Sequence, residues 1–535
     1  MRRPHRPVGE RLRLHSVAVG RRLPPPVRGR LRPLTGRPVD RTLRGLAAET
    51  VESFDAWGLQ SALAESIAGV LEQAGIEFVR MSRSGQEWVV VDSRRAPDAL
   101  RALQASSLTR TWIAAEVGRR RPRTLRSIDP DAAVPAFRLY RYLRAPSGAY
   151  VVSREICVLL EFWQPTAKGT LRPDGGEYVP HTLRPARHNR VAPYLAPAQW
   201  QDAQSRPGHR LAAQALPNIL EFTGPVDAVY TWVDDNDPAW RERRAAVDPG
   251  NQGLASDALD EARTRDREEF RHSLRSLAMY AGWIRHIWIV TDGQVPAWLD
   301  LEHPRITVVA HREIFADPDA LPVFNSHAIE SQLHHIPGLA EHFLYLNDDF
   351  FFGRPVRPEL FFHGNGLPKM MTSSIAIDLD TDTDERNGAM LAARRGREWI
   401  ERTFDRTITH RMQHVPHAHL KSAVADLEAL MPEDFARVAR SRFRHRDDLS
   451  VPSELAHYYG YATRRTVTGG LTYQYVDAGS ALGAERMGAL LAERSADCFC
   501  VNDVGGSPRD GEDEELRRFL SAYFPLPSPF ERIPS

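Results

Sequence analysis

The second half of the chain is predicted to fold as an α/β domain around a doubly wound, largely parallel sheet. Short apolar runs read as buried strands, amphipathic segments between them read as helices, and polar clusters follow three of the strands. Strands that alternate with helices favour a parallel sheet covered by helices on both faces. A helical C-terminal part at about residues 395–465 and an N-terminal accessory α/β module complete the predicted architecture.

The elements of this domain, residues 221–535, follow from the spacing of apolar residues. Phe270, Leu274, Leu277 and Ala281 recur at helical intervals and predict one helix. A second helix is predicted at residues 328–335. Strands are predicted at residues 226–233, 286–290, 306–310 and 343–346 because these runs are short, apolar and rich in β-branched and aromatic side chains.

The N-terminal part of the chain differs from this domain in amino-acid composition and in its predicted elements. Residues 1–45 are rich in arginine and proline and nearly free of acidic residues, which predicts a disordered basic tail, with a weak anchor to anionic lipid or polymer as the alternative. Residues 46–220 are predicted to form the accessory module, with a helix at residues 61–74 and strands at 87–91 and 150–162. This module offers no set of residues that suggests catalysis.

Length, charge and cysteine content exclude several classes of protein. The 535 residues predict two to four domains at roughly 100–200 residues each. The 70 Lys and Arg against 69 Asp and Glu give a formal net charge of +1, so we expect no nucleic-acid partner. The sequence contains no run of about 18 apolar residues, so we expect no membrane-spanning helix. Cys157, Cys498 and Cys500 are too few for a disulfide framework, which favours a cytoplasmic location.

Polar clusters at residues 234–237, 291–293 and 347–349 follow three of the predicted strands. Each cluster alone could be ordinary turn chemistry, because Asp, Asn and Gly are common turn residues. Ligands of doubly wound sheets bind outside the carboxyl ends of the strands, however, so three clusters at one edge predict a binding site.

Adjacent carboxylates in this cluster suggest a metal. Asp348 and Asp349 offer the hard oxygen ligands that Mg²⁺ or Mn²⁺ takes when it also holds phosphates. A cation would relieve the repulsion between them, although a capped turn is the alternative. Asp503 also follows a short apolar run and could complete the coordination.

Basic residues and imidazoles could supply the remaining chemistry. Arg271 and Arg275 share one helix face and could clamp a phosphate. A helix face that simply points its arginines into solvent is the alternative, and the sequence favours neither. His414 or His417 could act as a general base, although single histidines more often serve packing. Residues 443–448 could supply charge to a phosphoryl centre or form a structural ion-pair network.

Several stretches, in this order, resemble the conserved regions of the Stealth family, which contains bacterial capsule-polysaccharide phosphotransferases and the lysosomal-enzyme N-acetylglucosamine-1-phosphotransferase of animals. The similarity spans about residues 225–531. It is carried by VDAVYTWVDDNDPAW (226–240), REEFRHSLRSLAMYAGWIRHIWIVTDGQVPAWL (267–299), LPVFNSHAIESQLHHIPGLAEHFLYLNDDFFFG (321–353), the region 414–448 and CFCVND (498–503).

The resemblance implies a nucleotide-sugar transferase-like fold and a specific reaction. A sugar 1-phosphate, typically N-acetylhexosamine 1-phosphate, passes from a UDP-sugar to a hydroxyl of an oligosaccharide or polysaccharide acceptor, which leaves a phosphodiester and releases UMP. The cofactor expected is Mg²⁺ or Mn²⁺. The product would be a capsular or cell-surface polysaccharide, made by a cytoplasmic enzyme that associates peripherally with the inner face of the membrane. No pattern in the sequence indicates an oligomeric state.

The resemblance also assigns residues to roles. The essential positions of the family fall on Asp349, His414, Arg444 and Asp503, with Asp349 and Asp503 as metal ligands and His414 as the base. Arg275 would face the diphosphate. The substrate-binding residues expected are Thr231, Trp232, Asp234, Asp237, Arg271, Arg275, Asp292, Asn325, Asn347, Asp348 and His417.

Two other interpretations stay open at this point. A conventional nucleotide-sugar glycosyltransferase on a similar sheet would release UDP instead of UMP. A non-catalytic binding protein would use the same carboxylates only to cap strands, and would tolerate their replacement.

Overall fold

The computed structural model describes residues 48–532 with gaps at 84, 119–121, 142, 150, 152–155, 213–215, 248–253, 256–257, 260–265, 379–387 and 503–510. The chain from Leu34 onward forms one compact unit. The predicted tail at residues 1–45 and the predicted metal ligand Asp503 lie outside the described residues.

The N-terminal module is a mixed sheet with helices on both faces. Its main path runs β2-β3-β8-β6-β4-β5, with β9 paired to β8. Val89 and Val91 of β3 pack in the same core as α1 and α2, whereas Trp88 and Val90 pack with residues of α3, as the period of two in a strand requires. The elements are β1 (Glu49–Thr50), α1 (Ala56–Gln73), β2 (Phe78–Arg83), β3 (Gln86–Asp92), α2 (Ala96–Ala105), β4 (Trp112–Glu116), β5 (Arg123–Thr124), β6 (Ala136–Arg141), β7 (Leu143–Arg144), β8 (Val158–Pro165), β9 (Leu183–Arg184) and α3 (Pro197–Ser205).

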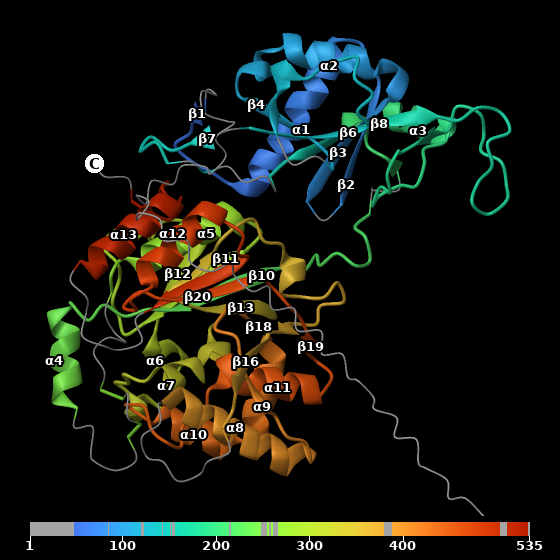
Figure 1. Ribbon diagram of the computed structural model, residues 1–535. Helices are drawn as coiled ribbons and strands as arrows, with labels where there is room; N and C mark the ends of the chain where they lie inside the picture. Colours follow the sequence, from blue (N-terminus) through green and yellow to red (C-terminus); the bar gives the residue numbers. More distant parts are fainter. Residues whose placement is uncertain are drawn as a thin grey trace, which may run out of the picture. The chain divides into compact units, whose positions relative to one another are not determined.

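A central sheet of order β12-β11-β10-β13-β18 organises the second half of the described chain (Figure 1). Its strands are β10 (Val226–Thr231), β11 (His286–Thr291), β12 (Ile306–Ala310), β13 (His342–Asn347) and β18 (His417–Leu420). The first four run parallel and β18 is antiparallel to β13. The predicted α/β fold with a largely parallel sheet is therefore confirmed.

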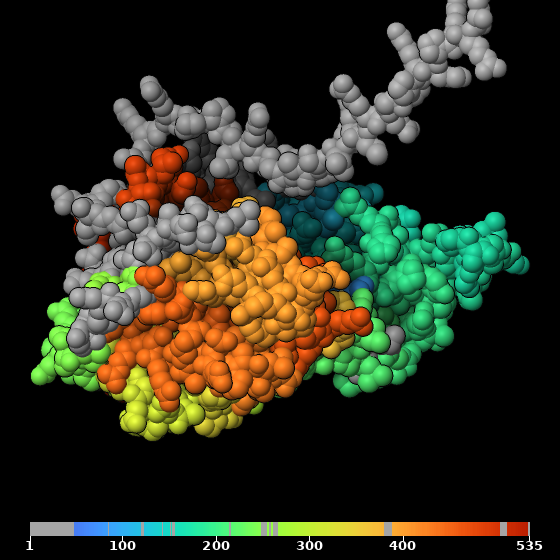
Figure 2. All heavy atoms as spheres, turned by 90° about the horizontal axis from the view of Figure 1, so that it is seen from below, coloured from blue at the N-terminus to red at the C-terminus, as the bar shows by residue number. Residues whose placement is uncertain are grey.

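Helices cover both faces of this sheet. Ala228 and Tyr230 of β10 pack with residues of α5 (Glu269–Tyr280). Val229 packs on the opposite face, in a core to which α8, α9, α10 and α11 contribute. Figure 2, seen from below, shows this second layer at the surface. The remaining helices are α4 (Pro238–Ala246), α6 (His311–Ile314), α7 (Ser326–Glu330), α8 (Gly388–Phe404), α9 (Lys421–Leu430), α10 (Pro432–Ala439), α11 (Ala456–Ala462), α12 (Gly483–Glu493) and α13 (Glu512–Tyr523).

Three small sheets complete the domain. The sheet β14-β21-β20 consists of β14 (Phe350–Phe352), β21 (Cys498–Asn502) and β20 (Tyr473–Asp477). The pair β15–β19 joins Lys369–Met370 to Val467–Thr468, and the pair β16–β17 joins Thr372–Ala376 to His410–Met412. The first of these sheets positions the candidate site.

Three predicted elements differ from the observed ones. The strand predicted at residues 150–162 lies partly outside the described residues, and the observed strand β8 begins only at Val158. The predicted helix at residues 328–335 is split into α7, whose start is capped by the Asn325 side chain, and the 3₁₀ helix η9 (Leu333–His335). The predicted helical part at residues 395–465 also contains strands β17 and β18. The pattern His417–Leu420 is short and buried on both faces, so helical periodicity around it concealed a strand of the central sheet.

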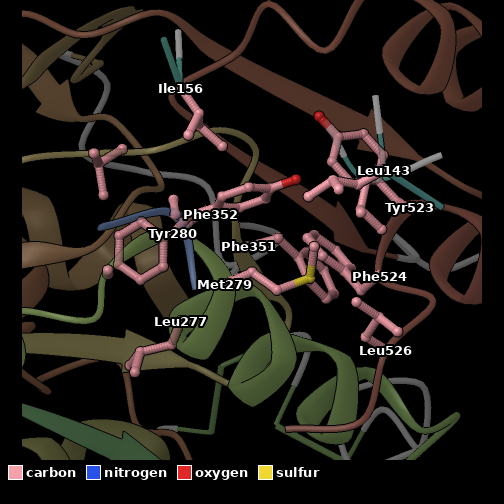
Figure 3. Close-up of a cluster of buried hydrophobic side chains, with 14 of the residues drawn as sticks. Leu143, Ile156, Leu277, Met279, Tyr280, Phe351, Phe352, Tyr523, Phe524 and Leu526 are labelled. Carbon is pink, nitrogen blue, oxygen red and sulfur yellow. The ribbon is translucent and has the colours of Figure 1, made fainter. Parts of the chain in front are cut away.

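Aromatic and aliphatic side chains from both halves of the described chain share one core (Figure 3). Leu143 and Ile156 of the N-terminal module belong to the same buried cluster as Tyr280, Phe352 and Phe524. No helix in the described part of the chain is long and apolar enough to cross a membrane.

A buried carboxylate ties the C-terminal segment to α5. The Glu531 side chain is only 2% exposed. It accepts hydrogen bonds from Nε and Nη2 of Arg275, each at 2.7 Å, and from Nε of Arg271 at 2.6 Å. Burial alone would raise the pKa of Glu531, but Arg275, the Ser528 amide and Arg271 together lower it to about 2. This cluster is a charged anchor inside the helix layer.

We predict that Glu531→Gln destabilises the protein in a pH-dependent way. Because the folded pKa of about 2 lies below the usual 4.5, the contribution of the ion pairs is fully present above about pH 4.5 and is lost as the pH falls toward 2. The substitution should lower the free energy of unfolding by about 3 kcal/mol at pH 7 and by clearly less at pH 3.5. Urea unfolding at both pH values measures this, and an equal loss at both would contradict the ion-pair account.

Candidate active site

Strand register brings the predicted polar clusters to one edge of the central sheet. Thr231, the last residue of β10, pairs with Asn347 of β13 on one side and with Val290 of β11 on the other. All three strands run parallel, so their carboxyl ends are level. The segments that begin at Trp232, Asp292 and Asp348 therefore leave the sheet at the same edge, as the sequence predicted.

Asp349 is the centre of this edge. Its Oδ2 accepts a hydrogen bond from the Cys500 thiol at 3.2 Å and lies 4.0 Å from Nε2 of His414. One donor atom from each of these three residues lies within 4.8 Å of the others. Oδ1 of Asp349 is buried and has no hydrogen-bond partner among the described residues. A buried carboxylate oxygen of this kind is costly unless something binds it.

The small sheet supplies Cys500 and holds His414. Phe350 of β14 lies opposite Cys500 of β21, which in turn pairs with Tyr475 of β20. The Phe350 ring packs edge-on against His414 at 4.5 Å, and the Tyr475 ring approaches it at 6.4 Å. The imidazole of His414 is thus positioned by two aromatic rings while 39% of its side chain stays exposed.

Several buried carboxylates lie close together in this region, and neighbouring acids add to the cost of their negative charge. Burial, with further contributions that include the charge of Glu269, raises the pKa of Asp349 to about 6. Burial and the charge of Asp349 raise the pKa of Asp348 well above its usual range. Burial, Glu269 and Asp234 likewise raise the pKa of Asp266 to about 6. Raised carboxyl pKa values mark a site where a cation or a proton is needed.

The donor set fits a hard divalent cation. Asp348 and Asp349 offer carboxylate oxygens, including the unpartnered Oδ1 of Asp349, which suit Mg²⁺ or Mn²⁺. Cys500 does not fit as a ligand, because burial and the neighbouring Asp349 raise the pKa of its thiol well above the usual value. A neutral thiol acts as a donor that orients Asp349.

The segment after β10, which carries the expected substrate-binding residues Asp234 and Asp237, is a turn fixed by hydrogen bonds. Gln294 donates through Nε2 to the Asp234 carbonyl at 2.8 Å and to Oδ2 of Asp237 at 3.0 Å. Asp237 also caps α4 by accepting the Ala239 amide. Asp292 accepts the Arg243 Nε–H at 3.0 Å. The turn chemistry considered as the alternative therefore applies to Asp237, and the same contacts fix the backbone around Asp234.

Thr231 and Trp232 are anchored beside the edge. The hydroxyl of Thr231 lies 3.2 Å from that of Tyr345, which donates to Glu330 at 3.1 Å. The indole of Trp232 is buried and stacks on Phe270 at 5.8 Å. Both residues therefore shape the wall of the edge from within the core.

Arg271 and Arg275 do not face the strand-end carboxylates. Both guanidinium groups bind Glu531, as described above, and Arg275 also donates to the Phe524 carbonyl at 3.4 Å. The expectation that Arg275 faces a diphosphate is not met in this structure. The two arginines share a helix face as predicted, but that face is turned toward the C-terminal segment.

Asn325 and His417 are also interior residues. Asn325 is 0% exposed, and its Nδ2 donates to Asp448 at 2.8 Å and to the Ser441 carbonyl at 3.0 Å. His417 is buried, and its Nδ1 lies 3.0 Å from Nε2 of His457. Burial and neighbouring histidines lower the pKa of His417 well below its usual value. Direct substrate contact, which was expected for both, is incompatible with this burial.

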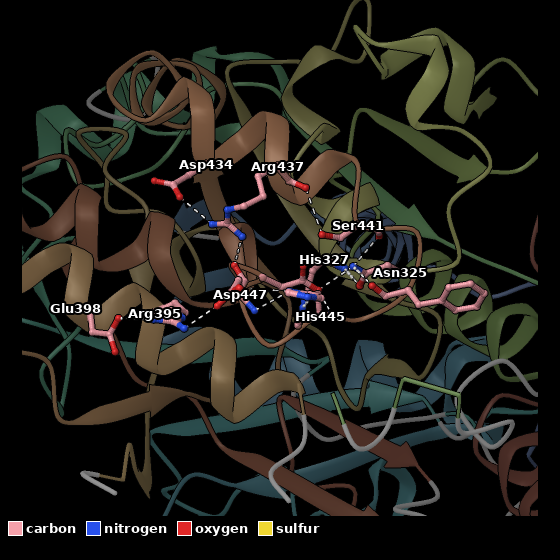
Figure 4. Close-up of polar contacts among 11 residues, drawn as sticks. Asn325, His327, Arg395, Glu398, Asp434, Arg437, Ser441, His445 and Asp447 are labelled. Atoms are coloured by element: carbon pink, nitrogen blue, oxygen red, sulfur yellow. Dashed lines mark hydrogen bonds and ion pairs between the residues drawn. The ribbon is translucent and has the colours of Figure 1, made fainter. Parts of the chain in front are cut away.

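The Arg444 side chain contacts the first residue of α7, because its Nη2 donates a hydrogen bond to the Ser326 hydroxyl at 2.9 Å. The segment that contains it is fastened on either side by Asn325, Ser441, His445 and Asp447, as Figure 4 shows. The structural-network interpretation of residues 443–448 is therefore correct for the residues next to Arg444. The structure brings Asp348, Asp349 and His414 to the sheet edge, and Asp503 follows directly after Asn502, the last residue of β21.

Sequence reasoning missed Cys500, Tyr475, Asp266 and Glu269. Cys500 and Asn502 lie two residues apart on β21 and so share one face of it, but only the pairing of β14 with β21 brings the Cys500 thiol to Asp349. Tyr475 reaches His414 through the same sheet. Asp266 and Glu269 flank the start of α5, where a turn of acidic residues is ordinary helix chemistry.

Models of four regions of one family match the chain in order. They are Stealth protein CR1, conserved region 1 (residues 224–252), CR2, conserved region 2 (263–370), CR3, conserved region 3 (413–461), and CR4, conserved region 4 (489–535). The strand ends of β10, β11 and β13, together with His414 and Cys500, fall within these regions.

Several relatives of this chain are named exopolysaccharide phosphotransferases. Exopolysaccharide phosphotransferase SCO6021 of Streptomyces coelicolor is 37% identical over 504 residues, which cover 87% of this chain and 89% of the relative. SCO6023 of the same organism is 43% identical over 72% of this chain and 66% of its own length, and SCO2592 is 42% identical over 70% and 40%. This chain thus spans about two thirds of SCO6023 and less than half of SCO2592.

A solved structure, the apo form of the bifunctional glycosyltransferase WbbM, shows a remote likeness, with 10% identity and a TM-score of 0.27 over 58% of this chain and 52% of that one. The fold assignment therefore rests on the strand order and register given above. The four family regions in sequence order, and a relative matched over nine tenths of its length, show that the chain belongs to the Stealth family.

Proposed function

We propose that the protein transfers a sugar 1-phosphate from a UDP-sugar to a hydroxyl of an oligosaccharide or polysaccharide acceptor during synthesis of a cell-surface polysaccharide. The observation that carries the proposal is the placement of Asp349 4.0 Å from His414 at the carboxyl edge of a parallel sheet. Membership of the Stealth family and the names of the relatives, exopolysaccharide phosphotransferases, support phosphoryl transfer over other chemistry on this fold.

The reaction exchanges one phosphorus–oxygen bond for another. The acceptor hydroxyl loses its proton and its oxygen attacks the phosphorus that carries the sugar. The bond from that phosphorus to the oxygen bridging the two phosphates breaks, and UMP leaves. The product is a phosphodiester between the donor sugar and the acceptor. Such a transfer requires mainly in-line positioning and neutralisation of charge on the phosphate oxygens.

His414 is the proposed general base. Its half-exposed imidazole is held between Phe350 and Tyr475 and faces the Asp349 carboxylate. A ring that is held in this way, with 39% of its side chain exposed, can accept the hydroxyl proton of a saccharide that approaches the edge of the sheet. The nearby carboxylate stabilises the imidazolium that results, since opposite charges at this distance attract.

Asp348 and Asp349 are the proposed ligands of a divalent cation, with Asp503 as the further ligand expected from the family resemblance. When bound, Mg²⁺ or Mn²⁺ would neutralise charge on the diphosphate. The Cys500 thiol keeps Oδ2 of Asp349 oriented, which leaves Oδ1 available. Arg444 is the proposed protein cation for the transferred phosphate. The reaction would take place in the cytoplasm at the inner face of the membrane, where the polymer grows.

The product distribution tests the reaction type. We predict that incubation with a panel of UDP-sugars, a saccharide acceptor and Mg²⁺ or Mn²⁺ yields a phosphodiester resonance and UMP in phosphorus NMR. Release of UDP with no diester signal would instead establish a conventional glycosyltransferase.

We predict that His414→Ala lowers kcat by about 10²- to 10⁴-fold, because general-base assistance to the acceptor hydroxyl is lost. The KM for the UDP-sugar should change little. The pH dependence of kcat should lose the limb that reports on the base. His303→Ala, at a half-buried histidine beside Phe530, serves as the matched control and should keep both kcat and the pH profile. Near-normal turnover of the His414 variant would overturn the base assignment.

We predict that Asp349→Asn lowers kcat by about 10²- to 10³-fold, the cost of removing one group that stabilises transition-state charge, and weakens Mg²⁺ binding. Without metal the variant should be at least as stable as the wild type, because one of two repelling buried carboxylates is removed. Asp131→Asn, at an exposed side chain in the N-terminal module, is the control. Mg²⁺ titration by calorimetry and a thermal melt measure both effects, and unchanged Mg²⁺ affinity would contradict the assignment.

A further inference from the structure

A second group of metal-ligating side chains lies in the helix layer, apart from the strand-end carboxylates. His334 and His335 of η9 both direct Nε2 at the same oxygen of Glu428 in α9, at 2.6 and 2.8 Å. The three donor atoms lie within 4.8 Å of one another. His334 is buried, while His335 and Glu428 are each a little over a quarter exposed at the side chain. Solvent and ions can therefore reach the cluster from one side.

The ring of His335 has a fixed orientation. Its Nδ1 lies 2.9 Å from the carbonyl oxygen of Ile314, the last residue of α6. Since a carbonyl can only accept, Nδ1 carries the proton, and Nε2 is the nitrogen left to face Glu428. Histidines that bind metals almost always donate their other ring N–H to a carbonyl or carboxylate in this way.

Charge in the cluster can be balanced in two ways. If protons lie between the imidazoles and the carboxylate, both nitrogens of His335 must donate, to Ile314 and to Glu428, so this ring is an imidazolium. Its ring centroid then lies 4.1 Å from that of His334. If a metal cation lies between the three donor atoms instead, both imidazoles are neutral and each presents the lone pair of Nε2 to the cation. In both arrangements Nε2 of each ring is the atom that faces the Glu428 carboxylate.

We propose that His334, His335 and Glu428 form a site for a divalent transition metal of the zinc type. Two imidazole nitrogens and one carboxylate oxygen make a set that zinc accepts with water as fourth ligand, and that Mg²⁺ does not favour. Tetrahedral ligands of zinc lie roughly 3.3 Å apart at bond lengths of about 2.0–2.1 Å. The observed 2.6 and 2.8 Å separations would therefore widen by about 0.7 and 0.5 Å on binding, which the partly exposed Glu428 side chain can provide.

The bound ion would have a structural role. It would join η9 to α9 and, through His335, fix the end of α6, so three segments distant in sequence would share one anchor. Leu333, Ile336 and Leu427 beside these ligands belong to the core under the central sheet. The site shares no ligand with Asp349, His414 or Cys500, so its occupancy and the proposed reaction can be tested separately.

Metal content measures the proposal directly. The full chain, without a histidine tag, is dialysed against buffer with about 1 µM free zinc and excess Mg²⁺, and zinc is counted by mass spectrometry. We expect about one zinc per chain, a Tm higher by about 2–4 °C than that of the zinc-free protein, and visible absorption bands of tetrahedral geometry when Co²⁺ replaces zinc. A wild type that retains no zinc would overturn the proposal and leave the imidazolium ion pair as the explanation.

Matched variants locate the ion. Glu428→Gln keeps size and hydrogen bonding, and His335→Ala removes one ligand; each should weaken zinc binding at least about 100-fold. Asp349→Asn and His303→Ala should retain one zinc. If Asp349→Asn loses the zinc while Glu428→Gln keeps it, the ion belongs to the strand-end site and the proposal is wrong. The wild-type Co²⁺ spectrum and zinc count decide the question even if a variant fails to fold.

Discussion

The concentration of negative charge at one sheet edge is the constraint on which the rest of the site depends. Asp348 and Asp349 follow a buried strand, and both carboxyl groups have raised pKa values because they are removed from water and lie among other acids. Folding places them there at a cost, since each would be better solvated elsewhere. Under the proposed function, a divalent cation bound between these carboxylates would offset their repulsion, so the same repulsion would favour cation binding.

The surrounding architecture holds this arrangement in place. Helices on both faces of the central sheet exclude water from the strands, and β18 closes one edge in antiparallel orientation. The three-stranded sheet then brings Cys500 to Asp349 from about 150 residues further along the chain. A thiol buried with a raised pKa is an uncharged donor, so it fixes one oxygen of Asp349 without neutralising the carboxylate, which keeps the charge that the proposed cation would bind.

The strands and the position of the site could be predicted because their signals are local. Buried parallel strands are short apolar runs, and the polar residues after them mark one edge whatever the remaining fold. The roles of Arg271 and Arg275 could not be predicted, because Glu531 lies more than 250 residues away. Asn325 and His417 were misjudged for a related reason. The family resemblance assigned both residues to substrate binding, whereas the fold gives them buried partners in Asp448 and His457.

Asp349 occupies the short connection between β13 and β14, which belong to different sheets. His414 contacts residues of the small sheet through Phe350 and Tyr475, whereas Asp348 continues from the large one. A shift of one sheet relative to the other would therefore change the distance between the Asp349 carboxylate and the His414 imidazole. The stacked rings of Phe351, Phe499 and Phe524 beside β14 oppose such a shift, so under the proposed function they would keep these two groups aligned.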